Sequence, residues 1–295
     1  MKKFVLFLYL IFNIIAHAEI TNYKANSGFI KINSNNFLIL RSFKQDNQNY
    51  LLVANVDTLE TKIVKNSFLI DTNISKLFNS TLFNMLNKYN IQTQNSYQNS
   101  GLKNSSQNCD GYFLTVDMCP SNKYGFEKEF FEKLLEYKNI AICLTKKWAI
   151  QHKNEFEWLK KMQQEKKLNI TWVNHSTNHF YDKTLPFEKN FLLHDKENFL
   201  NEIFETEKFM IENGLIPSLF FRFPGLVSDS EVIDKLKALY LLPLGANSWL
   251  AKGEKPTLGS IILVHGNLNE PKGIKLCNQF LDSVRPKLLK LNDIR

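Results

Sequence analysis

Residues 111–121 read GYFLTVDMCPS, a mostly apolar run (111–116) that ends at the carboxylate of Asp117. Further runs of this kind follow, separated by amphipathic stretches: NIAICL (139–144), LNITWVN (168–174), SLFFRF (218–223), YLLPLGA (240–246) and SIILVH (260–265). Apolar strands that alternate with amphipathic helices are typical of a parallel sheet covered by helices. The pattern predicts an α/β domain over residues 109–295, either a barrel or a doubly wound sheet, and the order of elements does not separate the two.

The stretches between these runs predict the helices of the same domain. They span residues 125–137, 147–166, 197–213, 229–239 and 271–290. Gly214 follows the third stretch directly, where glycine commonly ends a helix.

The N-terminal part of the chain, residues 19–108, is expected to form a β-rich region followed by a linker. FLILRSF (37–43) and YLLVANV (50–56) predict a hairpin around the polar loop KQDNQN. Residues 80–90 predict a helix capped by Ser80, and the polar segment 91–108 predicts the linker. We expect the β-rich region to cover an open edge or the bottom of the α/β domain.

Residues 1–18, MKKFVLFLYLIFNIIAHA, have the features of a secretory signal peptide. Lys2 and Lys3 precede an apolar run, and Ala16-His17-Ala18 is a typical cleavage signal. The run is shorter than the roughly 20 apolar residues that a membrane helix needs. The sequence therefore predicts export to the periplasm or medium, with no stable transmembrane segment after cleavage.

Composition narrows the functional classes. A hydrophobic content of 44% excludes wholesale disorder, and four cysteines in 295 residues exclude a disulfide-dense scaffold. We expect the cysteines to be buried free thiols. The net charge of +8 suits an anionic envelope or polymer, whereas no basic cluster with interleaved aromatic residues supports nucleic-acid binding. The sequence leaves the oligomeric state open.

Polar side chains recur at the carboxyl ends of the expected strands. Asp117, His175, Arg222 and His265 each follow or close an apolar run, and His179 lies four residues after His175. Sites of barrels and open α/β sheets are built at this edge. Two imidazoles four residues apart on a helical turn point the same way and suit a divalent metal. Ser176 stands where a zincin would have its glutamate.

Five segments in this order resemble the polysaccharide deacetylases, the NodB-homology or carbohydrate esterase family four. They are TVDMCPS (115–121), NHSTNH (174–179), FRFPG (221–225), GANSW (245–249) and ILVHG (262–266). The resemblance implies a distorted parallel (β/α) barrel that carries a divalent metal, zinc first, with cobalt or nickel as alternatives. It also implies removal of acetyl groups from N-acetylated polysaccharides such as peptidoglycan, chitin or exopolysaccharide.

The resemblance further implies a role for each matching residue. Asp117 would be the catalytic base, Arg222 would orient it, and His265 would be the acid that protonates the leaving amine. His175 and His179 would bind the metal. The substrate would meet Pro224 beside the arginine, the Gly225 backbone N–H at the oxyanion, Trp249 in the pocket and Leu263 at the acetyl methyl group.

The motifs depart from the family at the third metal ligand, an aspartate whose place Met118 takes. Gly245 and Ser248 replace two further aspartates, one of which supports the arginine. A thioether is a poor ligand for such cations. Three explanations stay open: Asp117 or water completes the metal shell, Cys119 or Asp182 replaces the ligand, or the metal has been lost.

The sequence accordingly supports three functional hypotheses. The first is an exported metal-dependent deacetylase of an N-acetylated sugar polymer. The second is a catalytically inactive carbohydrate-binding pseudoenzyme with the same barrel, suggested by Met118. The third keeps the hydrolase and changes the substrate to a non-sugar amide.

Overall fold

The structure is a computed structural model that describes residues 19–88, 99–105, 109–121 and 125–295. The expected signal peptide, residues 1–18, lies outside these ranges. Within them, every helix is too short or too polar to cross a membrane.

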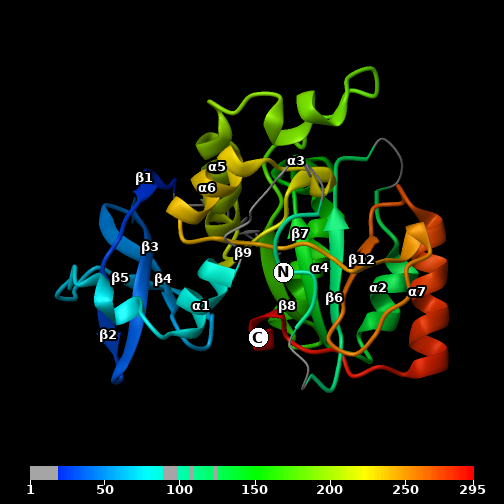
Figure 1. Cartoon of the computed structure of the whole chain (residues 1–295), viewed down its shortest axis with the longest axis horizontal. Helices are drawn as coiled ribbons and strands as arrows, with labels where there is room; N and C mark the ends of the chain where they lie inside the picture. The colour runs from blue at the N-terminus through cyan, green and yellow to red at the C-terminus, as the bar shows by residue number, and fades with distance from the viewer. Residues whose placement is uncertain (1–18, 89–98, 106–108, 122–124) are drawn as a thin grey trace, which may run out of the picture.

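A curled sheet of seven parallel strands forms the body of the protein (Figure 1). Neighbouring strands follow the order β10-β9-β8-β7-β6-β12-β11. The strands are β6 (Phe113–Met118), β7 (Asn139–Leu144), β8 (Asn169–Asn174), β9 (Pro217–Phe221), β10 (Leu242–Pro243), β11 (Ser248–Trp249) and β12 (Ile261–His265). The prediction of a distorted parallel barrel is confirmed. The two-residue strands β10 and β11 form the two ends of the curled sheet.

Helices cover the outer face of this sheet. They are α2 (Lys128–Leu134), α3 (Lys146–Gln151), α4 (Lys153–Gln164), α5 (Phe199–Glu212), α6 (Ser230–Ala238) and α7 (Pro271–Val284). The helix predicted over 147–166 is divided at His152, whose backbone is not helical. The helix predicted over 271–290 ends at Val284, because Arg285 has a left-handed backbone and Pro286 follows it.

The alternation of side chains along the strands separates two cores. On β6, Leu114, Val116 and Met118 join the cluster that packs under α2, α4 and α7. Phe113 belongs to the other cluster, which fills the inside of the curled sheet. Successive strand residues point to opposite faces, so Thr115 and Asp117 share the inner side with Phe113.

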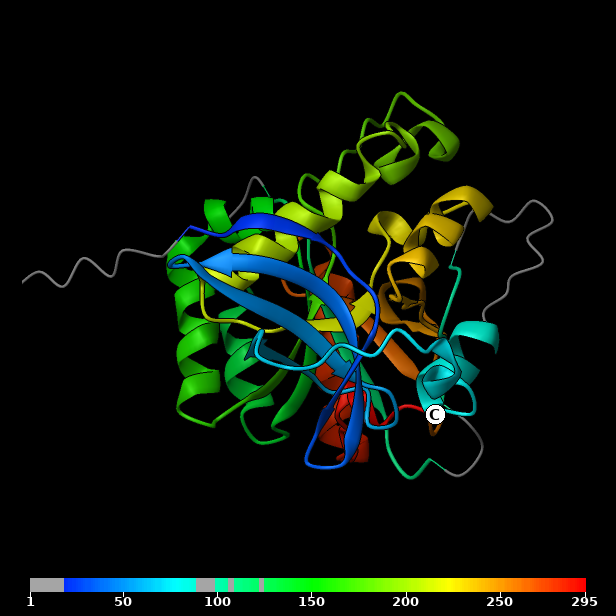
Figure 2. The same ribbon diagram turned by 90° about the vertical axis from the view of Figure 1, so that its left-hand side faces the viewer.

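The N-terminal region is an antiparallel sheet, as expected (Figure 2). It contains β1 (Thr21–Ala25), β2 (Phe29–Ile32), β3 (Asn35–Gln45), β4 (Gln48–Asn55) and β5 (Thr61–Lys65). The β3–β4 hairpin turns at Asp46 and Asn47 alone, both with positive φ, as two-residue loops require. Helix α1 (Thr81–Lys88) follows, and Ser80 Oγ accepts a hydrogen bond from Phe83 N–H, which confirms the predicted cap.

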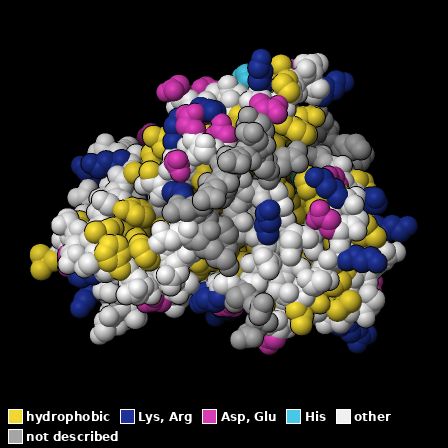
Figure 3. Space-filling model, viewed as in Figure 1, with side chains coloured by type: hydrophobic (Ala, Val, Ile, Leu, Met, Phe, Trp, Pro, Cys, Tyr) yellow, Lys and Arg dark blue, Asp and Glu magenta, His cyan; other side chains and the backbone are white. Residues whose placement is uncertain are grey.

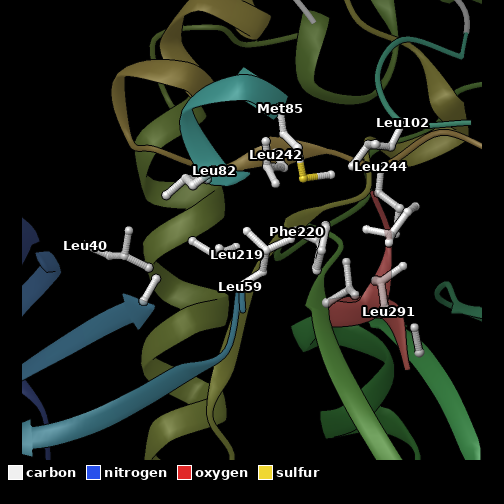
Figure 4. Close-up of a cluster of buried hydrophobic side chains, with 14 of the residues drawn as sticks. Leu40, Leu59, Leu82, Met85, Leu102, Leu219, Phe220, Leu242, Leu244 and Leu291 are labelled. Carbon is white, nitrogen blue, oxygen red and sulfur yellow. The ribbon is translucent and has the colours of Figure 1, made fainter. Parts of the chain in front are cut away.

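The antiparallel sheet packs against the β9–β10 end of the curled sheet. Leu40, Leu59, Leu82 and Met85 meet a set of barrel side chains in one buried cluster (Figure 4). These barrel residues are Leu219, Phe220, Leu242, Leu244 and Leu291. This region therefore covers an open side of the barrel, in agreement with the expectation.

A buried ion pair ties the same two parts together. Arg41 on β3 donates from Nε and Nη2 to both carboxylate oxygens of Glu207 on α5, at 2.8 and 2.9 Å. Tyr23 Oη donates to Glu207 as well, at 2.8 Å. Arg41 and Glu207 are almost fully buried, so each depends on the other for its charge partner.

Residues 99–105, expected to be part of a linker, instead bind to the barrel. Leu102 exchanges backbone hydrogen bonds with Pro243 and Gly245, and the Asn99 side chain pairs with the backbone of Ala246. The backbone of Leu102 and the side-chain amide of Asn99 pair with the barrel backbone as a neighbouring strand would. A polar composition does not predict such pairing.

Basic and acidic side chains are interspersed over the face seen in Figure 3. Three of the four cysteines are buried, and Cys109 is partly exposed; all four are free.

Candidate functional site

The strand-end residues that the sequence singled out meet at the carboxyl edge of the curled sheet. Asp117 on β6 and His265 on β12 are paired neighbours in the parallel ladder. His175 directly follows β8, and Arg222 directly follows β9. Because β9, β8, β7, β6 and β12 are consecutive in the sheet, these side chains come to one place from four distant segments.

Asp117 and Arg222 form a buried ion pair. Arg222 Nη1 donates to both carboxylate oxygens, at 3.1 and 3.2 Å. Burial alone would raise the pKa of Asp117, but Arg222, and after it His175 and His265, hold that pKa below its ordinary value. Asp117 is therefore a carboxylate at neutral pH, fixed with both oxygens at the edge of the site.

A hydroxyl and a backbone carbonyl support Arg222 where the resemblance led us to expect an aspartate. Its Nη2 donates to Thr115 Oγ1 at 2.9 Å and to the Gly245 carbonyl at 3.2 Å. Gly245 thus contributes through its main chain. Ser248, the other replaced position, is buried, and its hydroxyl has no hydrogen-bond partner among the described residues.

His175 and His179 lie with their ring centroids 4.9 Å apart. His175 Nδ1 is 2.7 Å from the Arg222 carbonyl, so this nitrogen carries a proton, and in the neutral imidazole the lone pair is on Nε2. Nε2 lies 3.8 Å from Asp117 Oδ2. His179 Nε2 is buried and has no partner among the described residues.

The expected helical turn between these histidines is absent from the described structure, which corrects that detail of the prediction. Residues 175–179 form a loop with left-handed backbone at Ser176 and His179. Glu202 on α5 holds the loop, because one carboxylate oxygen accepts from the N–H groups of Thr177 and Asn178 at 2.9 Å. Sequence reasoning missed Glu202, which lies on a helix face that the pattern treats as a packing surface.

Cys119 completes a group of possible metal ligands with the two histidines. The ligand atoms of Cys119, His175 and His179 all lie within 4.8 Å of one another, and Cys119 Sγ is 3.5 Å from His175 Nε2. Burial raises the pKa of the Cys119 thiol, but His179, His265 and His175 hold it well below its usual value. Nitrogen and thiolate donors in this arrangement fit a borderline divalent cation such as zinc.

Neither Asp182, the other replacement candidate, nor Met118, which stands at the position of the lost ligand, belongs to this group. Met118 is fully buried in the cluster under the helices, on the opposite side of the strand from Asp117. The carboxylate of Asp182 accepts hydrogen bonds from Thr184 N–H and Oγ at 2.8 and 2.7 Å.

A carboxylate that the sequence analysis did not select supports His265. Glu270 Oε2 is 2.8 Å from His265 Nδ1 and accepts a hydrogen bond of 2.8 Å from Trp249 Nε1. Burial lowers the pKa of His265, but Cys119 and Glu270 outweigh it and raise that pKa well above its usual value. A sequence signal existed, since Glu270 stands directly before Pro271 at a helix start, five residues after His265.

The residues expected to meet the substrate surround the same edge. Gly225 and Trp249 line a cavity of about 160 Å³ together with Asn99, Leu226, Ala246, Lys252 and Glu254. Leu263 is buried two residues before His265 on the same side of β12, and Pro224 is buried beside Gly225. The chain therefore brings a buried carboxylate, the His265 imidazole and a group of possible metal donors to one edge of the sheet, an arrangement that suits hydrolysis of an amide.

No family model matches the chain. Among solved structures, a family 4 carbohydrate esterase from Bacillus anthracis is similar over 72% of this chain and 90% of its own, with 19% identity and a TM-score of 0.50. A chitin deacetylase from the fungus Colletotrichum lindemuthianum covers 65% of this chain and 89% of its own (14% identity, TM-score 0.49). A pseudoenzyme of the same esterase family, also from Bacillus anthracis, covers 72% and 80% (16% identity, TM-score 0.46). Because the identity is only 19%, the similarity to the Bacillus anthracis esterase shows the fold alone. That fold is the one of a family 4 carbohydrate esterase.

Proposed function

We propose that this protein is an exported, metal-dependent deacetylase that hydrolyses the acetamide of an N-acetylated sugar polymer, such as peptidoglycan or an exopolysaccharide. The convergence of the Asp117–Arg222 pair, His265 and the two histidines at one edge of the sheet carries the proposal. The five motif resemblances and the fold shared with a carbohydrate esterase support the choice of substrate class.

The metal would be held by His175, whose Nδ1 is bound to the Arg222 carbonyl, and by His179, whose Nε2 is buried without a partner among the described residues. A divalent cation there supplies a Lewis acid that polarises the acetamide carbonyl and lowers the pKa of a water molecule towards ~7.

Asp117 is the proposed general base. Arg222 keeps it ionised and holds both of its oxygens, so the carboxylate faces the site ready to take a proton from the attacking water. The Gly225 N–H is the proposed donor to the developing oxyanion, and Leu263 is the proposed contact for the acetyl methyl group. Donors fixed in advance of the reaction stabilise such a charge without reorganisation.

His265 is the proposed general acid for the leaving amine. Glu270 binds its Nδ1, which leaves Nε2 as the proton donor on the side facing Asp117 and Cys119. An imidazolium kept protonated at neutral pH can give its proton to the nitrogen as the C–N bond breaks.

The test is acetate release from peptidoglycan and from N-acetylglucosamine oligomers, with zinc, cobalt or nickel supplied. We expect release that falls by about 10²–10⁴-fold in Asp117→Asn, the usual contribution of a general base. Circular dichroism would establish that both proteins are folded. Folded wild type that releases no acetate with any of the three metals would refute the proposal.

Export rests on residues 1–18 and is tested separately. We expect the chain recovered from the periplasm or medium to begin at Glu19, as read by N-terminal sequencing. Recovery of full-length chain from the cytoplasm alone would contradict export.

Met118 favours a second candidate, a carbohydrate-binding protein without catalysis. Its thioether is buried in the core, so the expected aspartate ligand has no side-chain equivalent at its own position. Sugar binding that survives a chelator, in a protein free of metal by elemental analysis, would support this candidate over the deacetylase.

A further inference from the structure

We propose that Cys119 is the third protein ligand of the cation, so that the chain binds its metal with one thiolate and two imidazoles. The inference rests on the proposed function only for the premise that His175 and His179 bind a cation. Metal binding itself can be measured without any substrate.

The separations of the donor atoms fit a zinc-type centre. With metal bonds of about 2.0–2.1 Å to nitrogen and about 2.3 Å to sulfur, a tetrahedral site places N and S about 3.5 Å apart. The observed distance from Cys119 Sγ to His175 Nε2 is 3.5 Å. The remaining separations stay within 4.8 Å, so small side-chain rotations bring all three donors around one ion.

The hydrogen bonding of His175 and the burial of His179 both suit a bound metal. The hydrogen bond from His175 Nδ1 to the Arg222 carbonyl selects the neutral tautomer whose lone pair is on Nε2, the nitrogen that faces Cys119. His179 Nε2 is buried without a partner among the described atoms, and such an atom lowers protein stability unless something binds it.

The backbone directs Cys119 towards the histidines. Met118 ends β6 with its side chain in the outer core, and the next residue therefore projects to the side of Asp117. Asn267 Nδ2 donates to the Cys119 carbonyl at 2.7 Å and anchors the main chain there. Cys119, one position later in the sequence, thus lies with the histidines, whereas the side chain of Met118 points away from them.

With Cys119 as the third ligand, Asp117 is not needed to bind the metal. A thiolate supplies the same single negative charge as the replaced carboxylate, so Asp117 stays paired with Arg222 and available as the base. A thiolate also favours zinc, cobalt and nickel over the hard ions magnesium and calcium.

The first experiment is X-ray absorption spectroscopy on the wild-type protein loaded with one equivalent of zinc. We expect one sulfur neighbour at about 2.3 Å together with nitrogen or oxygen neighbours at about 2.0–2.1 Å. A first shell without sulfur would overturn the inference, and this measurement needs no variant that might misfold.

Cobalt binding to matched variants assigns the sulfur. Wild type and Cys109→Ser, which changes a partly exposed cysteine upstream of β6, should show a thiolate-to-cobalt charge-transfer band in the near ultraviolet. Cys119→Ser should lose the band and at least about 100-fold in cobalt affinity, since even outer-shell partners are worth 10–100-fold. Cys119→Asp should keep binding without the band.

An unchanged band or unchanged affinity in Cys119→Ser would overturn the inference. These outcomes are independent of acetate release: a zinc–sulfur shell in a protein that deacetylates nothing would refute the proposed function and leave the ligand assignment standing.

Discussion

Replacing Glu207 with glutamine should destabilise the protein by several kilocalories per mole. Arg41 is completely buried, and Glu207 accepts from two of its nitrogens and from Tyr23 Oη. Glutamine is nearly isosteric but neutral, so the guanidinium would stay buried without a counter-charge. Breaking a buried pair from one side costs about 3–5 kcal/mol. For a domain of this size, that lowers Tm by roughly 6–20 °C.

The assay is urea unfolding followed by circular dichroism, with Glu205→Gln as the matched control. Glu205 lies on the same helix and pairs with Lys146 and Lys208 at the surface. Pairs of this kind contribute about 0–1 kcal/mol. The double variant Arg41→Met with Glu207→Leu should recover most of the loss, because it removes both charges together. If the free energies of unfolding of Glu207→Gln and Glu205→Gln lie within 1 kcal/mol of each other, the Arg41–Glu207 pair does not hold the antiparallel sheet to helix α5.

Three further predictions concern the site. Glu270→Gln should slow acetate release and move the basic limb of the pH–rate profile to lower pH, because the carboxylate raises the pKa of His265; an unmoved limb would contradict the positioning role. Glu202→Gln should weaken zinc binding by about 10–100-fold in a chelator competition, since its carboxylate holds the loop that carries His179, and wild-type affinity would show that the loop is held otherwise. Gly225→Ala should destabilise the protein more than Gly253→Ala, as measured by thermal unfolding. Both glycines have positive φ. A Cβ at Gly225 would stand 2.5 Å from a ring carbon of Phe191, whereas a Cβ at Gly253 would meet nothing within 4 Å. Equal losses in the two glycine variants would show that the backbone conformation alone matters.

The segments whose residues interact locally were predictable. Apolar runs bounded by polar residues gave the strands β6 to β9 and β12 within a few residues, because burial on both faces is visible in composition alone. The strand β11 was missed, since two residues carry no periodicity. The cap at Ser80 depends on that residue's own hydroxyl, and the stop at Gly214 depends on its freedom to adopt a positive φ; both agree with the structure.

Individual contacts between distant segments could not be predicted from the sequence. The sequence singled out Asp117, Arg222 and His265 because each stands where a strand ends, but it did not connect Glu270 to His265 or Glu202 to the histidine loop. Both acids lie on or beside helices, where a charged residue ordinarily means a solvated face.

What the sequence by itself determined is the order of strands and helices and the set of polar groups at one sheet edge, because periodicity and strand ends are local properties of the chain. Only the tertiary structure decided which of the next two residues after Asp117, Met118 or Cys119, faces the histidines. Met118 and Cys119 are adjacent: Met118, the last residue of β6, points into the outer core, and Cys119, directly after the strand, lies in the site. That choice depends on strand register and on the helices that pack outside, neither of which a motif contains.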